Sequence, residues 1–180
     1  MGEAERLFIG VPVDEAARAT LLRQLPRQIP GKPTPPENWH FTLKFLGSTE
    51  AVARDRLIEA MRAASFGQSF NLSFDRLGAF PNAGRARVLW IGTGAGHERL
   101  EAIAQKVEAV ASGIGFEREK RPFKPHLTIS RMKEPASVMQ LLSKVPAIQA
   151  TMRVNEVMLY RSELGGSHSR YSVVARFSLG

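Results

Sequence analysis

The feature that most constrains the fold of this chain is an order of predicted elements that occurs twice. Runs of apolar, β-branched residues predict strands, and apolar residues at helical spacing predict helices. In the first half we expect a strand at 6–13, a helix from the N-cap Asp14 to about 28, a strand at 39–46, a helix at about 49–64 capped by Ser48, and a strand at 70–77. The second half repeats this order with a strand at 87–91, a helix at 97–112, a strand at 126–130, a helix at about 136–144 and a strand at 151–160.

This repetition predicts a single bilobal α+β domain over residues 1–180. The repeat units span about 6–80 and about 87–160, and a strand at about 171–178 closes the fold. Each of the two pseudo-symmetric lobes is expected to hold an antiparallel-rich sheet with helices on the outside, with a central cleft between the lobes. The spacing is 32 residues from Phe8 to His40 (40 − 8) and 37 from Leu89 to His126 (126 − 89), which suggests an internal duplication.

A His-x-Thr-x motif opens the second strand of each unit, at His40 and at His126. Because side chains alternate along a strand, the histidine and the threonine of each motif point to the same side. Strict alternation also places Lys44 beside His40 and Thr42. The opposite side of the first strand then carries Trp39, Phe41, Leu43 and Phe45, and that of the second strand carries Leu127 and Ile129.

Two imidazoles and two hydroxyls facing one cleft suit the chemistry of a phosphodiester. An imidazole near its ordinary pKa of about 6.5 can act as an acid or as a base at neutral pH. One neutral histidine can take a proton from water while one protonated histidine gives a proton to the departing sugar oxygen. The hydroxyls of Thr42 and Thr128 can donate hydrogen bonds to the non-bridging phosphate oxygens, where charge accumulates. This chemistry requires no metal ion and no other cofactor.

Other interpretations of the histidines carry less weight. One His-x-Thr on a strand is ordinary, but two copies at matching places favour a function. Neither motif has an adjacent carboxylate, and two histidines alone are too few ligands for a typical zinc site, so we expect no metal site. His97, at a predicted helix start, and His168, in a predicted hairpin loop, are expected to lie at the surface. The glycine-rich run 92–96 is not a dinucleotide fingerprint, because His97 stands where glycine is needed.

The composition is that of a basic globular protein. The chain is 43% hydrophobic and 23% charged and has no cysteine, which excludes disulfides and cysteine nucleophiles. The net charge of +8 favours polyanionic partners, nucleic acid first. Basic residues gather at Arg85 and Arg87 and again at Arg118, Lys120, Arg121 and Lys124. There is neither a secretory signal nor an apolar run of the roughly 18–20 residues that span a bilayer, so we expect a cytoplasmic monomer that does not bind membranes.

The two motifs and their flanking segments resemble the two-histidine phosphoesterases. Within that group they are most similar to the RNA 2′,3′-cyclic phosphodiesterases, also called 2′-5′ RNA ligases. The resemblance covers nearly the whole chain, and the segments that carry it are 6–9, 38–47, 80–81, 87–90, 125–131 and 159–162. It implies a LigT-like fold without a cofactor.

The resemblance also implies an activity and a role for each site residue. The activity is hydrolysis of the 2′,3′-cyclic phosphate at an RNA end, such as that of a tRNA fragment, to a 2′-phosphomonoester. His40 is then the proton donor to the departing 3′-oxygen, and His126 is the proton acceptor that activates water. Thr42 and Thr128 hold the phosphate. The reverse reaction would join a 5′-hydroxyl to the cyclic phosphate through a 2′-5′ linkage.

Arg131 matches a family position and is a natural charge partner for a phosphate. Strict alternation places it opposite His126, so a strand end or a bulge must redirect it. Trp39 and Phe123 are candidates for stacking on a base, although Trp39 is predicted on the apolar face. Two alternative functions stay open: a module that binds RNA ends without turnover, and a phosphodiesterase for 2′-5′ oligonucleotides or other small cyclic phosphodiesters.

Overall fold

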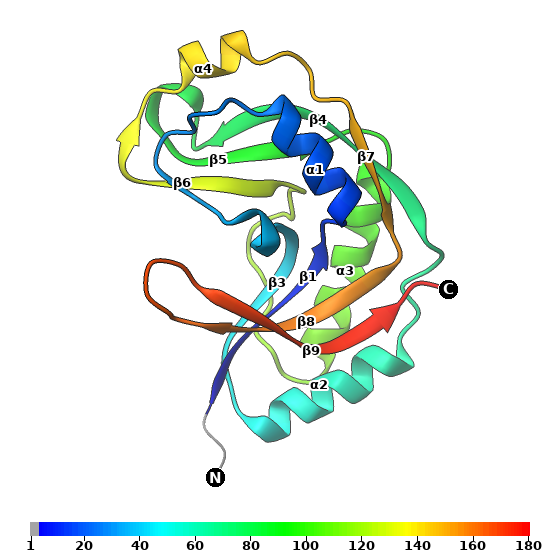
Figure 1. The fold of residues 1–180 in the computed structure, drawn as a ribbon. Helices are drawn as coiled ribbons and strands as arrows, with labels where there is room; N and C mark the ends of the chain where they lie inside the picture. Colours follow the sequence, from blue (N-terminus) through cyan, green and yellow to red (C-terminus); the bar gives the residue numbers. More distant parts are fainter. Residues whose placement is uncertain (1–3) are drawn as a thin grey trace.

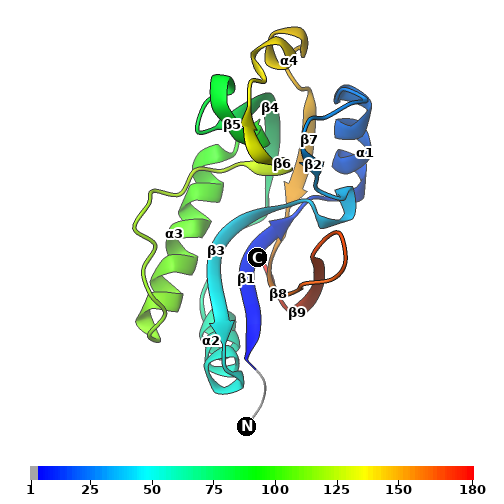
Figure 2. The ribbon, with the colours of Figure 1, turned by 90° about the vertical axis from the view of Figure 1, so that its left-hand side faces the viewer.

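A computed structural model describes residues 4–180, and its elements follow the predicted order (Figures 1 and 2). The first repeat unit holds β1 (Glu5–Pro12), α1 (Glu15–Gln24), β2 (Lys32–Pro33), β3 (His40–Thr49), α2 (Ala51–Ala63) and β4 (Phe70–Phe80). The second unit holds β5 (Ala86–Thr93), α3 (His97–Gly113), β6 (Leu127–Ala136), α4 (Met139–Lys144) and β7 (Ala150–Val154), and β8 (Glu156–Glu163) and β9 (Arg170–Ser178) follow.

The strands form one curled sheet in the order β7-β4-β5-β6-β3-β1-β8-β9, with β2 beside β6. Every pairing is antiparallel. We call β3-β1-β8-β9 the first half-sheet and β6-β5-β4-β7 the second half-sheet. The two half-sheets meet where Phe41 of β3 pairs with Leu127 of β6. The short strand β2 pairs with β6 through two residues, Lys32 and Pro33. The predicted α+β class is confirmed. The strands form one continuous sheet, in which β4 of the first predicted unit lies in the second half-sheet and β8 lies in the first.

The helices cover the sheet with their apolar sides. Figure 2 shows α3 and α1 on opposite sides of the strands. The buried residues of α2 and α3 include Leu57, Met61 and Leu100, and these belong to the same core cluster as Phe41 and Leu127. No helix within residues 4–180 is long and apolar enough to cross a membrane.

Two helix boundaries differ from the prediction. Helix α1 ends at Gln24, because Leu25 precedes a proline and its backbone is extended (ψ 150°). Helix α2 begins at Ala51, because β3 continues to Thr49, which pairs with Glu5 of β1. Ser48 therefore lies in the strand and is not the helix cap that we expected.

The second repeat unit shows two further differences. Strand β6 extends to Ala136, which pairs with Ala86 of β5, so α4 covers only Met139–Lys144. The strand predicted at 151–160 is two strands separated at Asn155. They are distinct because β7 pairs with β4 of the second half-sheet, whereas β8 pairs with β1 of the first. The chain crosses between the half-sheets at this point.

Candidate active site

The pairing of β3 with β6 brings the two His-x-Thr motifs together. Phe41 and Leu127 are register partners, and both are fully buried in the core. The residues on either side of each partner therefore project from the opposite face of the sheet. Those residues are His40, Thr42, His126 and Thr128, and all four are half-buried. The two imidazoles thus share one face of the sheet although they are 86 positions apart (126 − 40).

His40 is held at both ring nitrogens. Its Nδ1 lies 2.7 Å from the carbonyl oxygen of Asn38, and its Nε2 lies 2.8 Å from Oγ1 of Thr42. A carbonyl oxygen can only accept, so Nδ1 carries the proton of the neutral ring and Nε2 accepts from the threonine hydroxyl. Asn38 is fixed in turn, because the Nδ2 atom of its side chain donates to the backbone carbonyl of Ser169 at 2.9 Å.

His126 is held at one nitrogen only. Its Nδ1 lies 2.7 Å from the carbonyl oxygen of Lys124, which again places the proton of the neutral ring on Nδ1. Phe80 meets the ring edge-on with the ring centroids 5.1 Å apart. Within residues 4–180, Nε2 has no hydrogen-bond partner. The lone pair of Nε2 is therefore free to accept a proton from a bound water.

Three aromatic rings surround His40. The ring centroids of Phe8, Tyr171 and Tyr160 lie 4.7, 5.4 and 5.9 Å from that of His40. This burial lowers the pKa of His40 to about 4, against the raising effect of the Asn38 carbonyl, and the positive charges of Arg131 and His126 lower it further. Burial and the charge of Arg131 also lower the pKa of His126. Both rings are therefore neutral in the free protein at neutral pH.

NMR titration of the free protein is expected to give a pKa of about 4 for His40 and a pKa below 6.5 for His126. A nucleoside 2′-phosphate should raise both values, because its negative charge favours the protonated rings. A pKa of 6.5 or more for His40 in the free protein would contradict the aromatic enclosure.

The same pKa shift links stability to pH. The unfolded chain protonates His40 near its ordinary pKa of 6.5, whereas the folded chain protonates it only near pH 4. Between these values the unfolded state binds more protons, so the stability present above pH 6.5 is lost as the pH falls toward 4. A His40→Ala variant should lose less stability than the wild type over this range of pH in urea unfolding experiments.

A bulge in β6 places Arg131 on the catalytic face. The register between β5 and β6 shifts where Leu89 pairs with Ser130 and Trp90 pairs with Thr128, which leaves Ile129 as an extra residue. Ile129 and Ser130 are both buried, and Arg131 is exposed. An extra residue reverses the alternation beyond it. Arg131 therefore lies on the side of His126 and Thr128, as the family position requires.

A matching bulge in β3 contradicts our placement of Lys44 and Phe45. The register shifts between Ile9, which pairs with Lys44, and Gly10, which pairs with Thr42. Lys44 consequently points into the protein, where its Nζ lies 2.8 Å from a carboxylate oxygen of Glu108. Phe45 points outward and is 68% exposed. Phe45 is 86 positions before Arg131 (131 − 45), so the two residues occupy equivalent places in the two repeats.

The other residues singled out in the sequence lie outside this site. His97 begins α3 and contacts Thr93 and Glu101, at 2.8 and 3.2 Å. His168 lies in the loop between β8 and β9. Trp39 is buried in the core, as its position on the apolar face predicted, and Phe123 is partly buried against the core.

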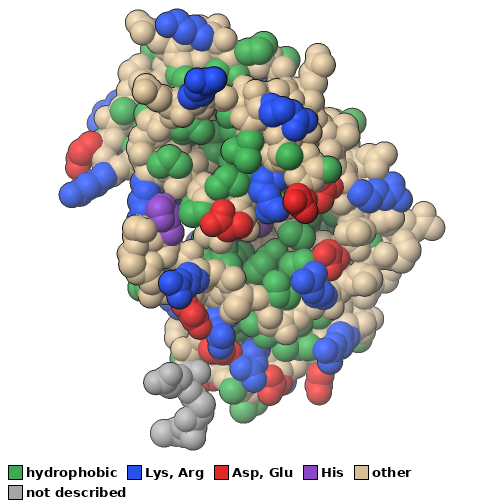
Figure 3. All heavy atoms as spheres, in the orientation of Figure 1, with side chains coloured by type: hydrophobic (Ala, Val, Ile, Leu, Met, Phe, Trp, Pro, Cys, Tyr) green, Lys and Arg blue, Asp and Glu red, His purple; other side chains and the backbone are tan. Residues whose placement is uncertain are grey.

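The face of the molecule in Figure 3 carries charge of both signs. On the face in Figure 3, basic side chains are spread around the surface and acidic ones lie among them. The cluster at Arg118, Lys120, Arg121 and Lys124 is exposed in the loop between α3 and β6, immediately before His126. Within residues 4–180, no three side chains of the metal-binding types gather where they could hold an ion.

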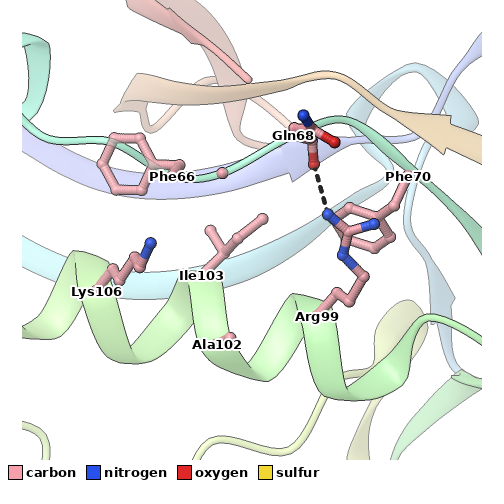
Figure 4. A pocket seen from close by; sticks show the side chains of 8 residues that line it. Phe66, Gln68, Phe70, Arg99, Ala102, Ile103 and Lys106 are labelled. Atoms are coloured by element: carbon pink, nitrogen blue, oxygen red, sulfur yellow. Dashed lines mark hydrogen bonds between the residues drawn. The ribbon is translucent and has the colours of Figure 1, made fainter. Parts of the chain in front are cut away.

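A cavity of about 230 Å³ adjoins His40 and is lined also by Arg18, Glu37, Tyr160 and Tyr171. A second cavity, of about 190 Å³, lies between α3 and the segment before β4, where Arg99 donates to the carbonyl of Gln68 at 2.9 Å (Figure 4). Neither histidine of the two motifs lines this second cavity.

Comparison with known proteins places the chain in a family. The family model of the 2′-5′ RNA ligase superfamily matches residues 12–166. The chain belongs to the 2′-5′ RNA ligase superfamily. Among curated relatives in this superfamily, an RNA 2′,3′-cyclic phosphodiesterase of Aquifex aeolicus is 32% identical and covers 97% of both chains. Another, of Archaeoglobus fulgidus, is 40% identical over 71% of this chain and 73% of its own length.

Solved structures agree with this superfamily membership. The crystal structure of Escherichia coli LigT complexed with 3′-AMP matches with a TM-score of 0.82 and 25% identity, covering 98% of this chain and 99% of that one. A structure described as a phosphoesterase matches with a TM-score of 0.85 and 26% identity. The predicted family and the predicted LigT-like fold are confirmed.

Sequence reasoning missed the roles of the aromatic residues around the histidines. Phe8, Phe80 and Tyr160 lay in segments that carried the family resemblance, but no role was assigned to them. Their positions depend on which strands are neighbours, since β1 and β8 lie on one side of β3 and β5 lies between β4 and β6. Phe45 was detectable only by aligning the two motifs with each other.

Proposed function

We propose that the protein hydrolyses the 2′,3′-cyclic phosphate at RNA ends to a 2′-phosphomonoester, with His40 as the acid and His126 as the base and without a metal ion. One observation carries this proposal: the two imidazoles share one face of the sheet, and each has its Nδ1 fixed on a backbone carbonyl. Both reactive Nε2 atoms are therefore oriented by the protein. The names of the superfamily relatives support the substrate.

In the proposed reaction, a water oxygen attacks phosphorus and its proton passes to Nε2 of His126. The bond from phosphorus to the 3′-oxygen breaks, and that oxygen receives the proton on Nε2 of His40. The bond to the 2′-oxygen remains, so the product is a 2′-phosphomonoester with a free 3′-hydroxyl. His126 then releases its proton to solvent, and His40 takes one up for the next turnover.

His40 must be protonated before it can act as an acid, although it is neutral in the free protein. A bound phosphate places a negative charge near the ring, which raises its pKa. When Nε2 acquires a proton it can no longer accept from Thr42, whose hydroxyl then becomes free to donate to a phosphate oxygen. Substrate binding would therefore prepare both the acid and one of its hydrogen-bond donors.

The remaining residues of the site would bind the substrate. Thr128 would donate to the phosphate from β6, as Thr42 does from β3. The guanidinium of Arg131 carries a fixed positive charge that acts on both histidines in the free protein and would be neutralised by the phosphate. Phe45 exposes a ring beside Phe8 at 6.3 Å between centroids, and it offers a face for the terminal base.

The same arrangement would support ligation, in which the 5′-hydroxyl of a second RNA end takes the place of water. Its oxygen would bond to phosphorus and its proton would pass to Nε2 of His126, while the bond to the 3′-oxygen breaks and that oxygen receives the proton from His40. The result is a 2′-5′ linkage. We propose ligation as a secondary activity, because water is far more abundant than RNA ends.

Phosphorus NMR of the product from an oligoribonucleotide with a 2′,3′-cyclic phosphate end tests the proposed function. In the presence of EDTA we expect full conversion to the 2′-phosphomonoester. Formation of the 3′-phosphomonoester would reverse the assigned bond cleavage. Activity that disappears with EDTA and returns with zinc would defeat the metal-free mechanism, and binding without conversion would favour a module that only holds RNA ends.

A further inference from the structure

We propose that Phe80, Trp90 and Arg76, which we call the Trp90 surface, bind the RNA nucleotides on the 5′ side of the terminal cyclic phosphate. This inference rests on the proposed function and adds a binding site for the body of the RNA. A hydrolase for RNA ends has to accommodate this body, which continues from the terminal nucleotide away from the catalytic histidines.

The Trp90 surface is continuous with the catalytic face. Trp90 of β5 is the register partner of Thr128, so both side chains leave the same side of the second half-sheet. Phe80 connects Trp90 to the catalytic histidine, because its ring centroid lies 5.0 Å from that of Trp90 and 5.1 Å from that of His126. An RNA strand leaving the site across β5 and β4 would meet these two rings first.

Two glycines allow the indole of Trp90 to lie against the sheet. A Cβ atom at Gly78, the register partner of Trp90 on β4, would lie only 2.2 Å from the indole ring. A Cβ atom at Gly92 would lie 3.0 Å from it. The six-membered ring therefore occupies the space that a side chain at position 78 would fill. This arrangement presents one side of the indole outward.

The outward side of the indole suits stacking and not hydrogen bonding. Trp90 is partly exposed, but its Nε1 is buried and has no hydrogen-bond partner within residues 4–180. A base lying on the ring would thus meet carbon atoms. Every base has a face that can stack on an aromatic ring, so binding here would be insensitive to RNA sequence.

Arg76 adds a cation over the ring of Trp90. Its guanidinium carbon lies 5.9 Å from the centroid of the Trp90 ring, and its side chain is 66% exposed. Nη1 binds the carboxylate of Asp75, and the guanidinium makes no other hydrogen bond to residues 4–180. Its remaining N–H groups can donate to a phosphate of the RNA backbone.

The first half-sheet does not repeat this surface. The position opposite Thr42, equivalent to that of Trp90, is Gly10. Phe8 and Tyr160 are 3% and 9% exposed and close around His40, so they cannot stack on a strand of RNA. Phe45 is 68% exposed, and it is the ring proposed above for the terminal base. We therefore assign the nucleotides on the 5′ side of that base to the second half-sheet.

The test compares two substrates with the same reactive group: a nucleoside 2′,3′-cyclic monophosphate and a hexaribonucleotide that ends in the same cyclic phosphate. Trp90→Ala should lower kcat/KM for the oligonucleotide about tenfold and leave kcat/KM for the mononucleotide within about twofold, because one stacked base is lost. Trp90→Phe should recover most of the oligonucleotide rate.

Arg76→Gln provides a second variant that removes no buried side chain. It should lower kcat/KM for the oligonucleotide only. It should also reduce, by about one, the magnitude of the slope of log kcat/KM against log salt concentration for that substrate. Arg153→Gln, on β7 of the same half-sheet, is the matched control and should change neither substrate.

Two outcomes for the variants at positions 90 and 76 would overturn the inference. One is an equal loss of kcat/KM with the oligonucleotide and the mononucleotide, and the other is no loss of kcat/KM with either substrate. Failure of the wild-type protein to convert either substrate would instead defeat the proposed function itself.

Discussion

Replacing His126 with alanine is expected to lower kcat for a nucleoside 2′,3′-cyclic phosphate by about 10²–10⁴-fold, the usual contribution of one positioned general base. His40→Ala should cause a loss of similar size, because an unprotonated 3′-oxygen is a poor leaving group. Steady-state rates at saturating substrate, with product identified by phosphorus NMR, measure both effects. The double variant should lose less than the product of the two single losses, since the groups act together.

The two histidines can be assigned separate roles with a second substrate. A phosphodiester that releases nitrophenolate needs little protonation of its leaving group, so His40→Ala should affect it much less than His126→Ala. His97→Ala is the control, because His97 lies on α3 outside the site. Near-wild-type rates for both catalytic variants on the cyclic phosphate would show that the site is wrongly assigned.

Glu108→Gln is expected to lower the free energy of unfolding by about 3 kcal/mol, because it leaves the ammonium of Lys44 buried without a counter-charge. The Lys44 side chain is 4% exposed, and its Nζ lies 2.8 and 3.0 Å from the two carboxylate oxygens of Glu108. The carbonyl of Glu117, at 2.8 Å, and the single amide oxygen that glutamine retains would still accept from Nζ, but neither carries a negative charge. Urea unfolding monitored by circular dichroism measures the loss.

The control for this prediction is Glu163→Gln, which removes one of the two acidic partners of Arg161 from an exposed pair at 3.2 Å. It should change stability by less than about 1 kcal/mol. Replacing Lys44 by methionine together with Glu108 by leucine should restore most of the stability, because neither charge is then buried. Equal losses for Glu108→Gln and the control would contradict a buried role for the pair.

The sequence alone predicted the order of elements and the matching positions of the two motifs within it, because both depend on periodic patterns. It did not predict that the two motif strands are paired with each other. It misplaced Lys44 and Phe45, because a single extra residue in β3 reverses the alternation and leaves no mark in the composition of the strand. The corresponding bulge in β6 was anticipated only because the family position of Arg131 conflicted with alternation. Sequence-local patterns cannot locate a bulge whose position is set by the neighbouring strand.

The low pKa of His40 was also beyond sequence reasoning. The rings that bury it come from β1, β8 and β9, so the enclosure exists only once the strand order is known. The break between β7 and β8 at Asn155 was missed for the same reason, because it too depends on the strand order. The local pattern from 151 to 160 is that of one strand, and only the sheet topology assigns its two parts to different half-sheets.

The short join between the half-sheets has a consequence for how such proteins can diverge. Phe41 and Leu127, whose pairing joins the half-sheets, each directly follow the histidine of their motif. If the angle between the half-sheets changed, they would rotate about this join, and atoms close to the axis of a rotation move least. Such a change would displace the outer strands by a large amount and the two imidazoles by very little. Substitutions in the outer strands and helices can therefore accumulate and reshape the surfaces around the site, while the distance between the two imidazoles is preserved.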